Sequence, residues 1–216
     1  MITTATIGYP RIGPKRELKK ALESFWKGDI KENELQSTAK DLRKKNWEIQ
    51  KENGIDLITS NDFSFYDQVL DTICLLGAVP DRYNWQGDDV DLKTYFAMAR
   101  GSQTKELDVS ALEMTKWFDT NYHYLVPELK SDQKFKISSQ KPFEEFKEAQ
   151  SAGYKTKPVL LGPITFLLLS KSTEGKNTLD LLDNLLPVYL EIVKKLNDLG
   201  GPRPPSPGTP ALQLVC

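Results

Sequence analysis

Apolar residues recur at the spacing of one helix face along much of the chain, and short β-branched or apolar runs lie between these stretches. The helical spacing predicts helices over residues 18–25, 35–49, 65–76, 92–99, 111–117, 142–152 and 179–199. The short runs predict strands over residues 2–7, 55–59, 121–126 and 157–161. Because short apolar strands alternate with helices, the pattern predicts βα units that form a parallel sheet.

The number of these units sets the expected size of the fold. A closed barrel of eight βα units typically needs about 250 residues, and this 216-residue chain has about four units. We therefore expect an α/β fold, a partial (βα)8 TIM-type barrel with about the first four βα units and parallel strands. Residues 1–200 form this domain in the prediction. Residues 201–216 contain five of the 13 prolines and lack periodicity, which predicts a disordered tail.

Composition narrows the class of protein. With 39% hydrophobic and 27% charged residues the chain is typical of soluble globular proteins. A net charge of −1 argues against a general nucleic-acid binder. We expect no signal peptide from the first residues of the sequence, and its longest apolar run, residues 164–169, is too short to span a membrane. Cys74 and Cys216 lie in no metal or redox spacing. We expect a cytoplasmic protein with no membrane partner.

Residues 8–20 form a loop rich in glycine and proline that leads into the first predicted helix. Four cations crowd the first turns of that helix: Lys15, Arg16, Lys19 and Lys20. The helix macrodipole is positive at this end and favours anions, so each cation costs about a few tenths of a kcal/mol. Two interpretations stay open at this point, a site for a polyanion and a solvated basic face.

Three further segments follow predicted strands or join them, where α/β sheets place their ligands. Residues 60–67 carry acids and amides that suit either a polar heterocycle or, as we favour, the N-cap of a helix at Asp62 or Ser64. Residues 113–124 combine Lys116, Trp117 and the only histidine, His123, which we expect to be a core or strand residue. Residues 161–165 are expected to be a structural turn. The local chemistry indicates binding of an anionic, partly aromatic molecule, without a nucleophile–base pair or zinc spacing.

Four motifs occur together: GYPRIGPKRELKKA (8–21), SNDFSFYDQVLD (60–71), EMTKWFDTNYHYLVPE (113–128) and KPVLLGPIT (157–165). In order and spacing they closely resemble the N-terminal domain of the cobalamin-independent methionine synthase family. These enzymes transfer a methyl group from 5-methyltetrahydropteroyltriglutamate to homocysteine. The resemblance runs from about residue 2 to residue 200 and marks residues 1–200 as the first part of the family's N-terminal barrel.

The resemblance implies a folate polyglutamate as ligand and assigns its contacts. The family's folate-binding motif matches Arg16, Glu17, Leu18 and Lys19, and a further binding lysine matches Lys116. A triglutamate tail is a polyanion of the kind that stabilises cations at a helix start. Trp117 is a less favoured candidate for a pterin contact, since we favour a packing role for it.

The resemblance also implies what this chain does not supply. The family is built of two (βα)8 barrels, and its zinc ligands and homocysteine site lie in the second barrel. We therefore expect no catalytic residue, no metal ligand and no bound zinc in this chain, whose sequence leaves the family pattern after Gly200. Two interpretations follow: a truncated methyltransferase that is inactive alone, or a non-catalytic fragment that binds folate polyglutamate or a partner. Uncovered barrel edges predict a tendency to aggregate.

Overall fold

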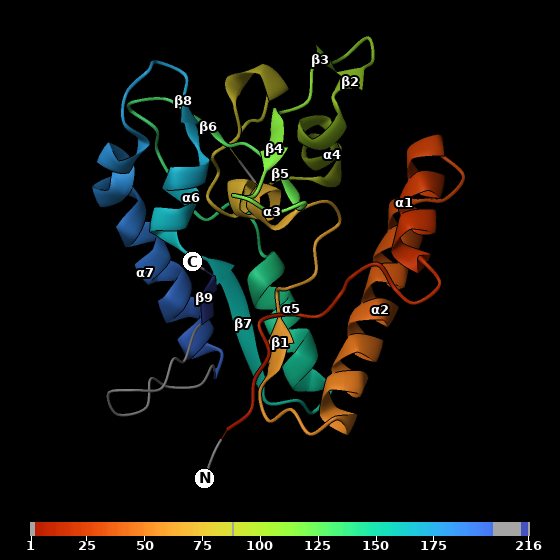
Figure 1. Cartoon of the computed structure of the whole chain (residues 1–216). Helices are drawn as coiled ribbons and strands as arrows, with labels where there is room; N and C mark the ends of the chain where they lie inside the picture. The colour runs from red at the N-terminus through yellow and green to blue at the C-terminus, as the bar shows by residue number, and fades with distance from the viewer. Residues whose placement is uncertain (1–2, 88, 201–212, 216) are drawn as a thin grey trace. The chain divides into compact units, whose positions relative to one another are not determined.

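Helices and short strands alternate along the chain in the computed structural model, which describes residues 3–87, 89–200 and 213–215 (Figure 1). The helices are α1 (Glu17–Lys27), α2 (Glu32–Glu52), α3 (Gln68–Leu75), α4 (Leu92–Arg100), α5 (Lys141–Ser151), α6 (Pro163–Leu169) and α7 (Leu182–Asp198), with 3-10 turns η1 (Asp81–Tyr83) and η2 (Thr178–Leu181). The strands are β1 (Ile58–Ser60), β2 (Ser102–Gln103), β3 (Asp108–Val109), β4 (Met114–Lys116), β5 (His123–Leu125), β6 (Glu128–Leu129), β7 (Thr156–Leu161), β8 (Lys171–Ser172) and β9 (Gln213–Val215).

The strand pairs define the fold class. β1 pairs with β7 in parallel, as does β6 with β8, whereas β2–β3 and β4–β5 are antiparallel hairpins. The largest sheet has the order β1-β7-β9. The fold is therefore mixed α/β with parallel strand pairs, as expected, and the described strands form no closed barrel. The disorder predicted for residues 201–216 falls on residues outside the described set, apart from the three in β9.

The chain divides into two compact units. The first comprises Met1–Phe65, Glu144–Val159 and Gly201–Gln213, and the second comprises Tyr66–Phe143, Leu160–Gly200 and Leu214–Cys216. In the first unit, α1 packs on α2, and a core forms where Trp47 and Ala149 cover Ile58 of β1. The Trp47 indole donates to the Thr59 carbonyl at 2.9 Å, so the packing of α2 also fixes the end of β1.

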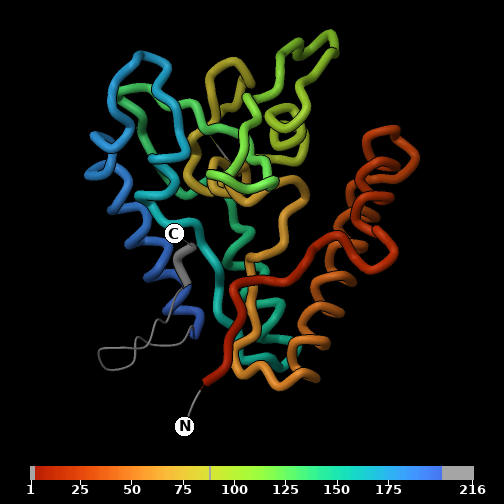
Figure 2. The backbone as a smooth tube through the Cα atoms, in the orientation of Figure 1, coloured from red at the N-terminus to blue at the C-terminus, as the bar shows by residue number. Residues whose placement is uncertain are grey.

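The N-terminal segment of the first unit is only loosely a strand. The sequence predicts a strand over residues 2–7, but the described part pairs with the region of β1 through one parallel bridge, Ala5 to Leu57 (Figure 2). Beyond this bridge, hydrogen bonds to the side chain of Gln50 take the place of hydrogen bonds between the two backbone segments. Gln50 Oε1 accepts from Thr6 Oγ1 at 3.0 Å and from the Thr59 amide at 3.4 Å. The segment therefore leaves β1 early and turns into the loop that precedes α1.

In the second unit, α3 and α4 pack together, and α6 and η2 pack on α7. The core face that the sequence predicts for the last helix is confirmed in part: Leu185, Ile192 and Leu196 are buried on α7, whereas Leu186 and Val193, predicted on the same face, are exposed. Tyr189 of the same helix donates to the Leu161 carbonyl at 2.7 Å, which ties α7 to the end of β7.

Two predictions for this unit are wrong. Residues 111–117 do not form a helix, because residues 114–116 pair antiparallel with β5 and place Trp117 against Tyr124. A short run with few apolar positions takes its structure from such cross-strand contacts rather than from helix propensity. Residues 161–165 are more than a turn, since α6 begins at Pro163, a residue favoured at the first helical position.

Candidate anion-binding site

In the first unit, the loop that precedes α1 contains two residues with a left-handed backbone conformation. Gly13 has a φ of 79° and Arg16, the N-cap residue, has a φ of 61°. The Arg16 amide donates to the Gly13 carbonyl at 3.0 Å, and the Leu18 amide donates to the Ile12 carbonyl at 3.2 Å. A Cβ at Gly13 would lie 2.9 Å from Leu42 Cδ2 of α2. The loop thus needs glycine at this position to lie against α2.

Glu17 binds the loop itself. Its Oε2 atom accepts from the Lys15 amide at 2.8 Å. The backbone amides of Glu17 and Lys15 lower the pKa of this carboxyl, because they donate to its charged form. An acid in the first turn also fits the positive end of the helix. Glu17 therefore offsets part of the cationic charge and fixes the backbone of the loop.

Leu18 and Lys19, the other two motif residues, have different surroundings. The Leu18 side chain is fully buried, so it anchors the helix in the core. Lys19 lies on the surface and forms an i,i+4 ion pair with Glu23 at 3.4 Å. Lys15, Arg16 and Lys20 are exposed and have no ion-pair partner among the described residues. The start of α1 therefore presents a group of uncompensated cations to solvent.

Asp62, just past the end of β1, fastens the same loop. Its Oδ2 atom accepts from the Tyr9 amide at 2.8 Å and from Thr59 Oγ1 at 2.9 Å. The N-cap that the sequence suggested at Asp62 or Ser64 is instead Asp67, whose Oδ1 accepts from the Val69 amide at 2.7 Å. The segment after β1 thus combines a helix cap with an anchor for the basic loop.

A partly buried ion-pair group supports the end of β1 and was missed in the sequence. Arg43 of α2 donates to Glu148 Oε2 at 2.7 Å and lies 3.7 Å from Glu145 Oε1. Glu145 Oε2 in turn accepts from the amide of Asn61, which has a φ of 59°. The guanidinium also lies 5.6 Å from the centre of the Phe63 ring. These residues are about a hundred positions apart, so no local pattern reveals them.

Lys116, the fifth predicted contact, lies in the second unit on the β4–β5 hairpin. It is exposed and stands opposite His123 in the register of the two strands. His123 is exposed too, so it is a strand residue and has no role in the core.

The Trp117 ring packs edge-on against aromatic residues of its own hairpin. The ring centres lie 5.8 Å from Phe118, 6.4 Å from Tyr122 and 5.9 Å from Tyr124. Phe118 in the turn has a φ of 47°, a strained value for a bulky side chain. These contacts favour the packing role expected for Trp117.

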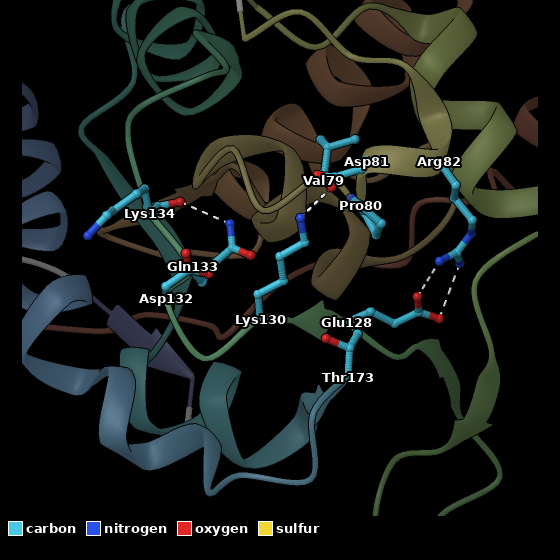
Figure 3. Close-up of a pocket in the computed structure, with 10 residues that line it drawn as sticks. All are labelled: Val79, Pro80, Asp81, Arg82, Glu128, Lys130, Asp132, Gln133, Lys134 and Thr173. Carbon is cyan, nitrogen blue, oxygen red and sulfur yellow. Dashed lines mark hydrogen bonds and ion pairs between the residues drawn. The ribbon is translucent and has the colours of Figure 1, made fainter.

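A surface hollow of about 400 Å3 lies elsewhere in the second unit (Figure 3). Its charged walls are occupied by internal pairs: Arg82 binds Glu128, and Lys130 binds Asp81. Arg82 also lies over the Tyr83 ring, 4.8 Å from its centre. None of the predicted contact residues lines this hollow, and its paired charges leave little net attraction for an anion.

The described residues contain no group of three His, Cys, Asp or Glu side chains arranged for a metal ion. No helix within the described ranges is long and apolar enough to cross a membrane.

Cys74 is a buried free thiol. Burial raises its pKa, so the thiol is inert and its role is packing.

The fold and the loop define a class: a mixed α/β domain with cations gathered at a helix start. The chain belongs to the cobalamin-independent synthase family, whose N-terminal domain model matches residues 3–202. It is 53% identical over 206 residues to a protein of Salinibacter ruber, covering 93% of this chain and 27% of that protein. It is 58% identical over 195 residues to a protein of Flavobacterium johnsoniae, covering 89% of this chain and 25% of that protein.

Both relatives are named 5-methyltetrahydropteroyltriglutamate–homocysteine methyltransferase, as is one from Xylella fastidiosa strain M23. The protein from Xylella fastidiosa is 54% identical to this chain over 200 residues, covering 93% of this chain and 26% of that protein. The chain thus spans about a quarter of the length of these relatives. The family resemblance inferred from the four motifs is confirmed.

Proposed function

We propose that this chain forms the polyglutamate-binding part of a methyltransferase that makes methionine from homocysteine and 5-methyltetrahydropteroyltriglutamate. The proposed contacts are Arg16, Glu17, Leu18, Lys19 and Lys116. Arg16 and Lys19 bind carboxylates of the tail, Glu17 sets the loop backbone, and Leu18 anchors α1. Lys116 binds carboxylates from its own unit. The proposed compartment is the cytoplasm.

One observation carries this proposal. The start of α1 holds exposed cations without ion-pair partners among the described residues, on a loop fixed by Asp62 and Glu17. A flexible chain would let these cations move apart, whereas a fixed loop keeps them close, with the Glu17 carboxylate offsetting only part of their charge. A ligand with several adjacent carboxylates supplies the missing counter-charge.

The finer fold is part of the same proposal. We propose that the parallel pairs β1–β7 and β6–β8, with the helices that follow them, are the first βα units of a (βα)8 barrel. The support is that α6 follows β7 directly and that Asn61 and Asp62 lie just past the carboxyl end of β1. Barrels of this class place their ligand-binding loops at that end of the strands.

Methyl transfer needs more than these residues supply. In the complete family the methyl group passes to the homocysteine sulfur, and zinc activates that thiol. The proposed contacts of this chain hold and orient an anionic tail, whereas the resemblance assigns the zinc ligands and the homocysteine site to the second barrel. We therefore propose that the 216-residue chain binds the folate and does not transfer its methyl group alone.

The test is a calorimetric titration of pteroyltriglutamate against the wild-type chain and the double variant Arg16→Ala/Lys19→Ala. Loss of two charge contacts should weaken binding by about tenfold or more, equal to about 1.4 kcal/mol. The matched control is Lys93→Ala, which removes an exposed lysine paired with Glu106 in the second unit. Equal affinities of the double variant and the wild type would overturn the proposed site.

A second assay separates an enzyme from a binding fragment. The purified chain is incubated with homocysteine, the methylated triglutamate folate and zinc, and methionine is measured. We expect binding in the titration and no methionine. Methionine formation would contradict the proposed inactivity of the chain alone.

A non-catalytic interaction fragment remains the second candidate. It is favoured by the apolar residues that α6 and α7 expose, such as Leu168 at 59% and Leu190 at 70%. Absence of folate binding together with stable capture of a protein partner would support it over the first.

A further inference from the structure

Helix α7 carries two apolar faces, and the described residues cover one of them. The covered face includes Leu185 and Ile192. The other face is an exposed stripe of Leu186, Leu190 and Val193, which are 40%, 70% and 39% exposed. Steps of four and three residues are the spacing of a seam along which two helices pack. One apolar stripe is enough to hold a surface helix on its own core, so the exposed stripe calls for a partner.

A charged residue stands at each end of the exposed stripe, and the two charges have opposite sign. Asp183 lies one turn before Leu186, and Lys194 lies one turn after Leu190. Asp183 and Lys194 are 11 positions apart, which is about three turns of an α-helix, so they share the face of the two leucines. Both are exposed, and neither has an ion-pair partner among the residues that the structure describes.

The order of these groups determines how two copies of the face fit together. In a parallel pair, Asp183 would face Asp183 and Lys194 would face Lys194. In an antiparallel pair with Leu186 of one copy opposite Leu190 of the other, Asp183 of each copy lies within about 1.5 Å, along the helix axis, of Lys194 of the other. Like charges across an interface repel, and opposite charges set its register. The face is therefore complementary to itself in the antiparallel orientation.

We propose that α7 forms the contact of a symmetric dimer of this chain, in which the exposed stripes pack antiparallel and Asp183 of each copy pairs with Lys194 of the other. A second copy matches this order of charges by symmetry, which an unrelated partner does not. The same patch serves both copies, so the assembly closes at two chains. Pro187 is exposed on the same helix and adds an apolar ring beside the leucines. The dimer goes beyond the proposed function and does not depend on folate binding.

Sedimentation equilibrium tests the dimer with charge reversals. We expect the wild type to dimerise in the micromolar range, because the contact of one helix pair is small. Asp183→Lys and Lys194→Asp each place like charges at both contacts and should weaken dimerisation by about tenfold or more. An equimolar mixture of these two variants should regain wild-type affinity, because their heterodimer has opposite charges at both contacts. The double variant Asp183→Lys/Lys194→Asp should regain it as well.

Two controls separate this pairing from net charge and from misfolding. Asp198→Lys makes the same charge change at an exposed position of α7 beyond the stripe and should dimerise like the wild type. Thermal unfolding shows whether each variant is folded, and the double variant carries both substitutions in one chain. Wild-type affinity of both single variants, or a mixture that associates no better than either variant alone, overturns the dimer. A wild type that stays monomeric at every concentration also overturns it and assigns the stripe to a different occupant, a further segment of the longer relatives.

Discussion

Asp67 shows how one residue couples a helix start to a neighbouring strand. Its carboxylate accepts from the Val69 amide at the start of α3 and from the Leu125 amide on β5. Only 2% of the residue is exposed, and burial raises the pKa of this acid to about 7 despite the backbone donors. A sequence reveals the capping residue type, but the second contact depends on a strand 58 positions away.

This raised pKa predicts a pH-dependent stability. The pKa of Asp67 rises from its ordinary value of 3.8 in the unfolded chain to about 7 in the folded chain. The folded chain therefore binds the Asp67 proton more tightly than the unfolded chain does. The contribution is therefore fully present below about pH 4 and is lost as the pH rises through about 7, by on the order of 4 kcal/mol. Asp67→Asn should remove this part of the slope and cost about 1–2 kcal/mol at low pH, because the Leu125 amide loses its acceptor.

Urea unfolding between about pH 4 and about pH 8 measures both effects. Asp41→Asn, an exposed position on α2, is the control that should keep the wild-type slope. A wild-type slope in Asp67→Asn would show that Asp67 does not titrate in this range.

At the scale of elements, the loop before α1 depends on two features: its backbone conformation and its closeness to α2. Gly13 and Gly28 flank α1 with nearly equal φ angles of 79° and 82°. A Cβ at Gly28 would meet nothing within 4 Å, whereas one at Gly13 would lie 2.3 Å from Glu17 Oε2.

These two glycines give a matched pair of variants. Gly28→Ala should cost about 1 kcal/mol, from the left-handed conformation alone. Gly13→Ala should cost about 1–2 kcal/mol more, because Glu17 and Leu42 must also move, and it should weaken triglutamate binding where Gly28→Ala does not. Thermal unfolding and the folate titration measure the two effects. Equal costs and equal affinities for the two variants would contradict the close-approach argument.

The sequence identifies best the elements that are long enough for their hydrophobic periodicity to recur several times. The long helices α2 and α7 were predicted because several buried positions recur along each, such as Leu35 to Trp47 on α2. Of the hairpin β4–β5 only the second strand was predicted, since the three residues of β4 carry too little periodicity to show that they pair with β5. The basic loop was found from its charges. Its anchor Asp62 and the ion pairs of Arg43 that support the end of β1 were not, because their contacts join distant parts of the chain.

At the scale of the whole molecule, α6 and α7 expose apolar residues at helical spacing. On α7 the exposed positions are Leu186, Leu190 and Val193, and on α6 they are Ile164 and Leu168. Exposed apolar stripes of this kind promote association between molecules in water. They agree with the aggregation expected from uncovered barrel edges, which stays a prediction.

Leu190→Lys tests this expectation, because Leu190 is 70% exposed and its replacement should leave the core intact. We expect light scattering to show concentration-dependent association of the wild type and clearly less of the variant, with similar unfolding midpoints. Asn184→Lys adds the same charge at an exposed position of α7 outside the stripe and should associate like the wild type. Equal reduction by both lysines would assign the effect to net charge.

The single rung between Ala5 and Leu57 has a kinetic consequence for the exposed edge of β1. The Leu57 amide donates to the Thr4 carbonyl at 3.0 Å, so its hydrogen exchanges with solvent whenever the N-terminal segment detaches. The Thr59 amide donates to Gln50 of α2 instead, and its exchange is governed by the opening of a helix. Two amides two positions apart on the same edge therefore report two different motions.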